Sequence, residues 1–338
     1  FVLLTLRSIG TQPAAPVLTT LPPTQTPIPT WTPTPTPSPT APPTMAPTPL
    51  PTATTPPTFL SLEDAGRLDQ IAVQVADFRG LQPLRPVPRW MITREQLSTY
   101  YVEPLLDRGG EEQLVDLALV LNLFDMVGPN YDLVSAVKHG LPNSVAGFYD
   151  PESGGIYLVS DTGVIGLREE VVFAHEFGHA LQDQHFGLLS LGFGEVGVSY
   201  DQLDRFNAVR ALIEGDAELI EAWYWDSRIS SEASTFPLAG LTFRPTVFES
   251  QRADYVAHTS IVDEVFRFPY LYGARFVRAL YERGGWAAVD AAYADPPAST
   301  EQILHPARYR AGDRPLAVSI PALTDPLGAG WQPIFEDV

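Results

Sequence analysis

The chain has 338 residues, of which 45% are hydrophobic, so it is long enough for one large globular domain with its own core. Its 40 acidic and 21 basic residues give a formal net charge of -19, and a field of that sign repels phosphate backbones, so we expect no nucleic-acid partner. The chain contains no cysteine, which excludes disulfides and cysteine-ligated zinc and leaves histidine and carboxylate as metal ligands.

The first 58 residues are unlike the rest of the chain. Residues 1–10 begin with an apolar run, which we interpret as the remnant of a signal peptide or membrane anchor rather than an incidental terminus. Residues 11–58 hold half of the 34 prolines and no charged residue. Because proline favours extended polyproline II and cannot support a hydrogen-bond ladder, we expect a disordered Thr/Pro-rich stalk, with a plain linker as the alternative. A stalk of this kind predicts an extracytoplasmic protein, secreted or anchored at a membrane surface.

Residues 59–338 have the composition of one folded domain. Helical apolar spacing covers residues 61–80, a short strand is predicted at 87–92, and Thr93 to Gln96 fit a capping box at the start of another helix. An apolar helix is expected at 111–126 and a β-hairpin at 145–159. From about residue 167 onward helices dominate. Few strands followed by many helices indicate an α+β domain that is mostly helical with a small sheet.

The pattern His175-Glu176-Phe177-Gly178-His179 is an HExxH motif. In a helix, residues four apart share one face, so His175 and His179 can present two imidazoles to one zinc ion. Glu176 points about 100° away around the helix and can address a metal-bound water instead. The acidic residues that precede the motif suit the start of such a helix. Two histidines satisfied by ordinary contacts are the alternative.

Two residues compete to be the third protein ligand. His185 continues a His-x-x-Gln182-x-x-His spacing that is one residue away from the metzincin pattern, which has glycine where Gln182 stands. Glycine allows the chain to turn back toward the metal, and metzincins also carry a methionine turn after the third histidine. Here every methionine precedes the motif. The metzincin pattern therefore fails at two points, and Glu214 is the second candidate.

The segment Ala211-Leu212-Ile213-Glu214-Gly215-Asp216-Ala217, following an HExxH helix, resembles the gluzincin metallopeptidases. The resemblance implies a zincin-like fold, Zn²⁺ held by His175, His179 and Glu214, and Glu176 as the general base. In thermolysin-like members an aspartate follows the ligand glutamate by four residues, and Glu218 stands at that position. Asp183, four residues after His179, matches another aspartate of those enzymes. Both would orient a ligand imidazole.

Transition-state stabilisation needs a further donor. A His-Pro pair after a helical stretch recurs in one gluzincin branch, which makes His305 the candidate, with Tyr270 and Tyr272 as weaker alternatives. A strand of the hairpin at 145–159 could pair with extended substrate. We expect a zinc metallopeptidase that acts on peptides or proteins. The alternatives are a surface-displayed binding or adhesion module without turnover, and a zinc hydrolase of a non-peptide amide.

Overall fold

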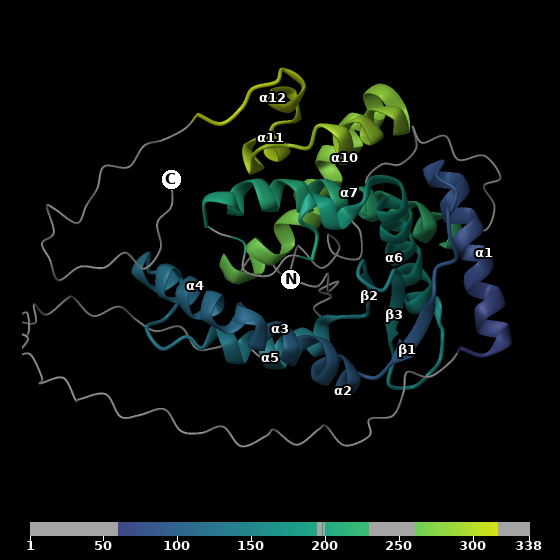
Figure 1. The fold of residues 1–338 in the computed structure, drawn as a ribbon, viewed down its shortest axis with the longest axis horizontal. Coiled ribbons are helices and arrows are strands. Elements are labelled where there is room, and N and C mark those ends of the chain that lie inside the picture. The colour runs from purple at the N-terminus through teal and green to yellow at the C-terminus, as the bar shows by residue number, and fades with distance from the viewer. Residues whose placement is uncertain (1–59, 195–197, 199, 230–260, 317–338) are drawn as a thin grey trace, which may run out of the picture. The chain divides into compact units, whose positions relative to one another are not determined.

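A computed structural model describes residues 60–194, 198, 200–229 and 261–316, so the expected terminal remnant and stalk lie outside the described residues. The helices are α1 (Leu62–Arg79), α2 (Arg94–Leu97), α3 (Glu103–Leu105), α4 (Glu111–Leu123), α5 (Leu133–Ser144), α6 (Leu167–Phe186), α7 (Tyr200–Ile229), α10 (Ile261–Ala294), α11 (Thr300–Leu304) and α12 (Pro306–Arg310). The strands are β1 (Arg89–Ile92), β2 (Gly147–Asp150) and β3 (Gly155–Val159). Two π-helical segments, η1 (Ser98–Val102) and η2 (Leu106–Gly110), and a 3-10 turn, η3 (Leu188–Leu191), complete the described elements. The expected α+β class, mostly helical with a small sheet, is confirmed (Figure 1).

The sheet has the order β1-β3-β2, with β1 parallel and β2 antiparallel to the central strand. β2 and β3 form the expected hairpin. Its turn is closed by the Asp150 carboxylate, which accepts hydrogen bonds from the backbone N–H groups of Glu152 and Ser153. Gly154 in this turn has a φ of 67°, a left-handed conformation that glycine adopts without steric cost. In the order β1-β3-β2, β2 is an edge strand of the sheet.

Successive strand residues face two different hydrophobic clusters, as the side-chain period of two requires. Tyr149 and Leu158 pack with α1 and α6, whereas Phe148 and Val159 pack with α2, α4 and α5. The sheet therefore lies between two helical layers. A third cluster joins α7, α10, α11 and η3, and Figure 1 shows α10 and α11 beside α7.

The ends of the early helices follow from local sequence. The Ser61 hydroxyl accepts a hydrogen bond from the Asp64 N–H at the start of α1, and the capping box expected at Thr93 and Gln96 is present at the start of α2. α10 is bent where Gly284 and its neighbour leave helical geometry. Across the described residues, none of the helices combines the length and apolar character needed to cross a bilayer.

Candidate metal centre

The HExxH motif lies in the middle of α6, as expected. At the start of this helix the Glu169 side chain accepts a hydrogen bond from the Gly166 N–H (2.9 Å), and acidic residues in the first turn interact favourably with the helix dipole. His175 and His179 lie one turn apart and are fully buried. Their Nε2 atoms are 3.1 Å apart, so both rings point to one place.

α7 supplies the third member of the group, Glu214. Its Oε2 atom lies 3.4 Å from the Nε2 atom of each histidine. The three donor atoms all lie within 4.8 Å of one another. Glu214 is fully buried, and among the described residues neither of its oxygens accepts a hydrogen bond of normal geometry. Because a buried carboxylate without such partners is costly, the arrangement fits a cation held between the three side chains.

Gly178, between the two histidines of the motif, lies where α6 packs against α7. A Cβ atom at Gly178 would lie 2.8 Å from Cδ1 of Ile220 and 3.7 Å from the backbone of Ala217. Cδ1 is the end of the flexible Ile220 side chain, so an alanine at position 178 would require Ile220 to shift, whereas the contact with Ala217 is an ordinary one. Gly178 thus lies in the contact between α6 and α7, the two helices that carry the histidines and Glu214.

The carboxyl group of Glu214 stays ionised despite its burial. Burial alone raises its pKa, but the imidazoles of His175 and His179 and the charge of Arg210 outweigh that effect and lower the pKa to about 2. Arg210 is one turn earlier on α7, with Nε 3.8 Å from Oε1 of Glu214. The site therefore presents a fixed negative charge to the two rings.

His175 sits in a strongly acidic environment. Burial lowers its pKa, but interactions with Glu214 and Glu221 and the charge of Glu176 raise it well above the usual value. Two of these carboxylates come from α7 and one from α6. A cation among them would replace the proton that His175 otherwise attracts.

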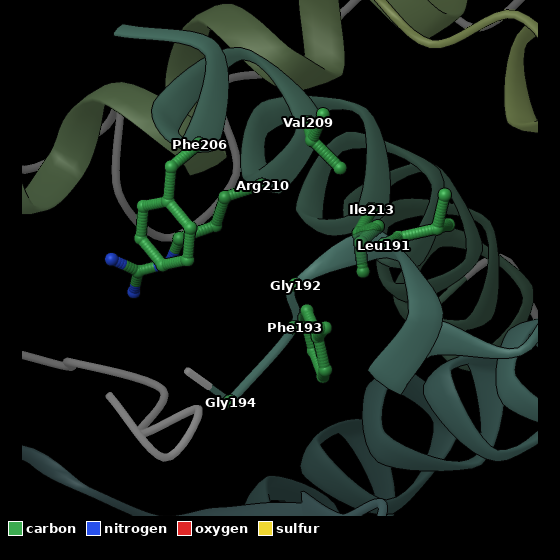
Figure 2. Close-up of a pocket in the computed structure, with 8 residues that line it drawn as sticks. All are labelled: Leu191, Gly192, Phe193, Gly194, Phe206, Val209, Arg210 and Ile213. Atoms are coloured by element: carbon green, nitrogen blue, oxygen red, sulfur yellow. The ribbon is translucent and has the colours of Figure 1, made fainter. Parts of the chain in front are cut away.

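A small apolar pocket lies near His179, and Figure 2 shows the residues that line it. Its lining consists of Leu191, Gly192, Phe193, Gly194, Phe206, Val209, Arg210 and Ile213. The ring of Phe193 lies 5.5 Å from that of His179, centroid to centroid, and Ile213 directly precedes Glu214. Figure 2 shows Phe206 and Arg210 on the side of the pocket opposite Phe193. The free space in the pocket is about 10 Å³, room for a water molecule rather than for a side chain.

Glu176 is fully buried and contacts the edge of the sheet. Its Oε2 atom accepts a hydrogen bond from the backbone N–H of Tyr149 on β2 (2.9 Å). The general base expected from the motif is thus held by a backbone donor. The same contact engages the Tyr149 N–H, so a substrate strand that paired with β2 would have to use other backbone groups.

Tyr270 of α10 is an aromatic neighbour of the centre that carries a hydroxyl group. Its ring is 6.4 Å from that of His175, and the residue is buried. Burial and the nearby negative charge of Glu214 raise the pKa of Tyr270 well above its usual value. The hydroxyl therefore remains protonated and able to donate a hydrogen bond.

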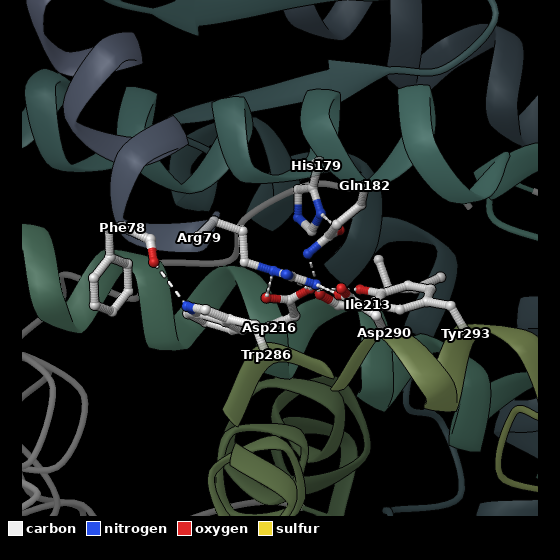
Figure 3. Close-up of polar contacts among 9 residues, drawn as sticks. All are labelled: Phe78, Arg79, His179, Gln182, Ile213, Asp216, Trp286, Asp290 and Tyr293. Atoms are coloured by element: carbon white, nitrogen blue, oxygen red, sulfur yellow. Dashed lines mark hydrogen bonds and ion pairs between the residues drawn. The ribbon is translucent and has the colours of Figure 1, made fainter. Parts of the chain in front are cut away.

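Nδ1, the outer ring nitrogen of each histidine, faces away from Glu214, and its partner differs between the two histidines. Nδ1 of His179 lies 2.8 Å from Oε1 of Gln182, as Figure 3 shows. Nδ1 of His175 lies 3.2 Å from Oε2 of Glu221 and 3.9 Å from Oε1 of Glu218. Glu218 was expected near a ligand ring, but Glu221 lies closer. Gln182 and Glu221 were not expected, although each shares a helix face with a metal ligand.

An ion-pair network surrounds Asp216, two residues after Glu214 on α7 (Figure 3). The guanidinium of Arg79, fully buried at the end of α1, donates to both oxygens of Asp216 and to Asp290. The Tyr293 hydroxyl donates to Asp216 (2.9 Å), and the guanidinium lies 4.3 Å from the ring of Trp286. Because Asp216 is two residues from Glu214, this network ties α1 and α10 to the ligand-bearing part of α7.

Two histidines considered from the sequence lie elsewhere. His305 is exposed in the turn between α11 and α12, and its side chain contacts none of the described residues of the centre. His185, the alternative third ligand, donates a ring hydrogen bond to the Gln82 carbonyl (2.8 Å). The structure brings Glu214, rather than either of these, to the HExxH pair.

Asp183 also differs from its expected role. Its carboxylate accepts hydrogen bonds from the Tyr149 hydroxyl (2.7 Å) and from Arg85 (3.0 Å). The position beside His179 is taken by Gln182 instead, because the Asp183 carboxylate is engaged by these other partners. Asp183 therefore stabilises the packing of β2 against α6.

No family model, curated protein or solved structure matches this chain. The interpretation of the centre therefore depends on its own geometry: buried histidine and glutamate side chains that can hold a metal ion.

Proposed function

We propose that the chain is a zinc-dependent peptidase whose metal is held by His175, His179 and Glu214. The observation that carries this proposal is the convergence of two imidazole nitrogens and a carboxylate oxygen in a buried site. Zinc hydrolases use such a ligand set and leave the fourth position open, whereas magnesium and calcium prefer oxygen ligands throughout. The acidic surroundings of His175 also favour a divalent cation.

A zinc ion held there would polarise a substrate carbonyl and lower the pKa of a coordinated water to about 7. Proton transfer is the proposed task of Glu176. Its carboxylate lies next to the ligand histidine in the motif, and the Tyr149 N–H fixes its orientation. Glu176 would take the proton of the attacking water and deliver it to the leaving amine.

Negative charge that develops on the substrate carbonyl needs a donor close to the ligands. Tyr270 fits this task better than His305, because it is buried beside His175 and keeps its proton. Arg210, 3.8 Å from Glu214, supplies a positive charge at the rim of the apolar pocket. Fixed donors in a buried site stabilise such charge without reorganisation.

The proposed substrate is a peptide or protein, whose scissile carbonyl a zinc ion at this centre would polarise. An extracytoplasmic location is part of the proposal and depends on the Thr/Pro-rich residues 11–58 alone.

The test compares the full-length protein with its Glu176→Gln variant. Bound zinc is measured by elemental analysis, and cleavage is measured with casein and a peptide library. We expect equal zinc content in both proteins and a loss of cleavage of at least about 100-fold in the variant. Cleavage that survives the substitution would contradict the role of Glu176. Zinc binding without cleavage of any peptide by the unmodified protein would favour a binding module or an amidase of another substrate class.

A further inference from the structure

Gln182 is a fully buried polar residue that contacts both helices of the centre, α6 and α7. It lies on α6, three residues after His179. Its Oε1 atom is 2.8 Å from Nδ1 of His179, and its Nε2 atom donates to the backbone carbonyl of Ile213 (3.2 Å). Ile213 immediately precedes Glu214, so the amide joins one ligand to the peptide unit before another (Figure 3).

The donors and acceptors in this chain of contacts can be assigned without reference to a metal. A backbone carbonyl only accepts, so the Gln182 atom that faces Ile213 must be the NH₂ group. The carbonyl oxygen of the amide then faces His179 and can only accept, which requires a proton on Nδ1. The lone pair of the His179 ring is consequently on Nε2, the atom that faces His175 and Glu214.

We infer that Gln182 is a positioning residue that selects the metal-binding tautomer of His179 and fixes the distance between α6 and the Glu214 segment. The inference extends the proposed function, since it assigns a role toward the same zinc ion. It also predicts an asymmetric centre. The outer nitrogen of His179 faces a neutral amide, whereas that of His175 faces the carboxylate of Glu221. Outer partners of this kind tune the basicity and orientation of ligand imidazoles.

The first test needs no substitution in Gln182. The full-length protein, labelled with ¹⁵N-histidine and treated with chelator, is examined by long-range ¹H–¹⁵N correlation spectroscopy under alkaline conditions. A spectrum of His179→Ala assigns the ring. We expect His179 to be protonated at Nδ1 and unprotonated at Nε2. The opposite tautomer would overturn the inference. Because this test uses no zinc, its result is independent of whether the proposed function is correct.

The second test compares Gln182→Leu with Gln184→Leu, a matched control two residues along the same helix. Gln184 is partly buried, and its amide oxygen accepts hydrogen bonds from the backbone N–H groups of Leu84 and Arg85 rather than from a ligand. The Kd for zinc is measured by chelator competition. We expect it to rise about 10- to 100-fold for Gln182→Leu and to stay unchanged for Gln184→Leu. An unchanged Kd for zinc in a folded Gln182→Leu variant would overturn the inference. If that variant does not fold, the tautomer of His179 in the unsubstituted protein decides whether the inference stands.

Discussion

Gly215 on α7 and Gly273 on α10 meet backbone to backbone. A Cβ atom on Gly215 would collide with the carbonyl of Gly273, and one on Gly273 would collide with the carbonyl of Ala211. Gly215 directly follows Glu214, and Tyr270 lies one turn before Gly273. The close approach of the two helices therefore brings the proposed hydrogen-bond donor to the proposed metal ligand.

Gly215→Ala is expected to force α7 and α10 apart. Overpacking of this kind costs about 1–3 kcal/mol, and a displacement of about 1 Å at the site can cost about 100-fold in rate. Urea unfolding and peptide cleavage measure the two effects. Gly66→Ala on α1 is the control, because a Cβ atom there meets nothing within 4 Å, and it should stabilise the protein by about 0.5–1 kcal/mol. Equal stability of the two variants would contradict the close helix contact.

Asp216→Asn tests the buried network around Arg79. The substitution leaves a fully buried guanidinium with a single carboxylate partner, Asp290, and should lower the free energy of unfolding by about 3 kcal/mol. Glu282→Gln, which removes an exposed ion pair with Arg278, should cost under about 1 kcal/mol. Chemical denaturation of both variants gives the comparison. A small effect at Asp216 would show that the network does not hold α1, α7 and α10 together.

Tyr270→Phe is expected to lower kcat about 100-fold while the Kd for zinc stays constant, because the hydroxyl donates to developing charge and is not a metal ligand. The raised pKa of Tyr270 predicts that this donor is not lost as the pH rises through the usual range for tyrosine. His305→Ala should leave kcat unchanged, since His305 is exposed outside the centre. The reverse result, with kcat lost in His305→Ala and kept in Tyr270→Phe, would exchange the two roles.

The pH dependence of stability follows from His175 and Glu214. Because the pKa of His175 is raised in the folded protein, its contribution to the free energy of unfolding is complete below about pH 6.5. That contribution is lost as the pH rises through the pKa of His175 in the folded state. Because the pKa of Glu214 is lowered in the folded protein, its contribution to the free energy of unfolding is present above about pH 4.5 and is lost as the pH falls toward about 2. Zinc competes with the proton on His175. The increase in Tm that zinc produces should therefore grow as the pH rises from 6.5, and a shift that shrinks instead would contradict the assignment.

Much of the fold and the central motif could be predicted from sequence because their causes are local. The capping box at Thr93 and Gln96, the turn at Asp150 and the helical spacing of His175 and His179 depend on residues a few positions apart. Each of these interactions is complete within one helix end, turn or helix face. Local patterns of this kind survive in the folded chain.

The surroundings of the centre depend on packing and were harder to predict. Tyr270 reaches the centre only because two glycines let α10 touch α7, and Arg79 finds its partners 137 and 211 positions away. Gln182 could have been found from its place on the face of His179. A side chain three residues along a helix from a ligand histidine can reach the ring, as Gln182 does at Nδ1 of His179.

The most direct measurement is the zinc content of the full-length protein, of Glu214→Ala and of His185→Ala, each determined by elemental analysis after dialysis. The account predicts one zinc per chain in the unsubstituted protein and in His185→Ala, and loss of zinc in Glu214→Ala. Zinc retained in Glu214→Ala and lost in His185→Ala, or no zinc in the unsubstituted protein, would contradict the proposed centre.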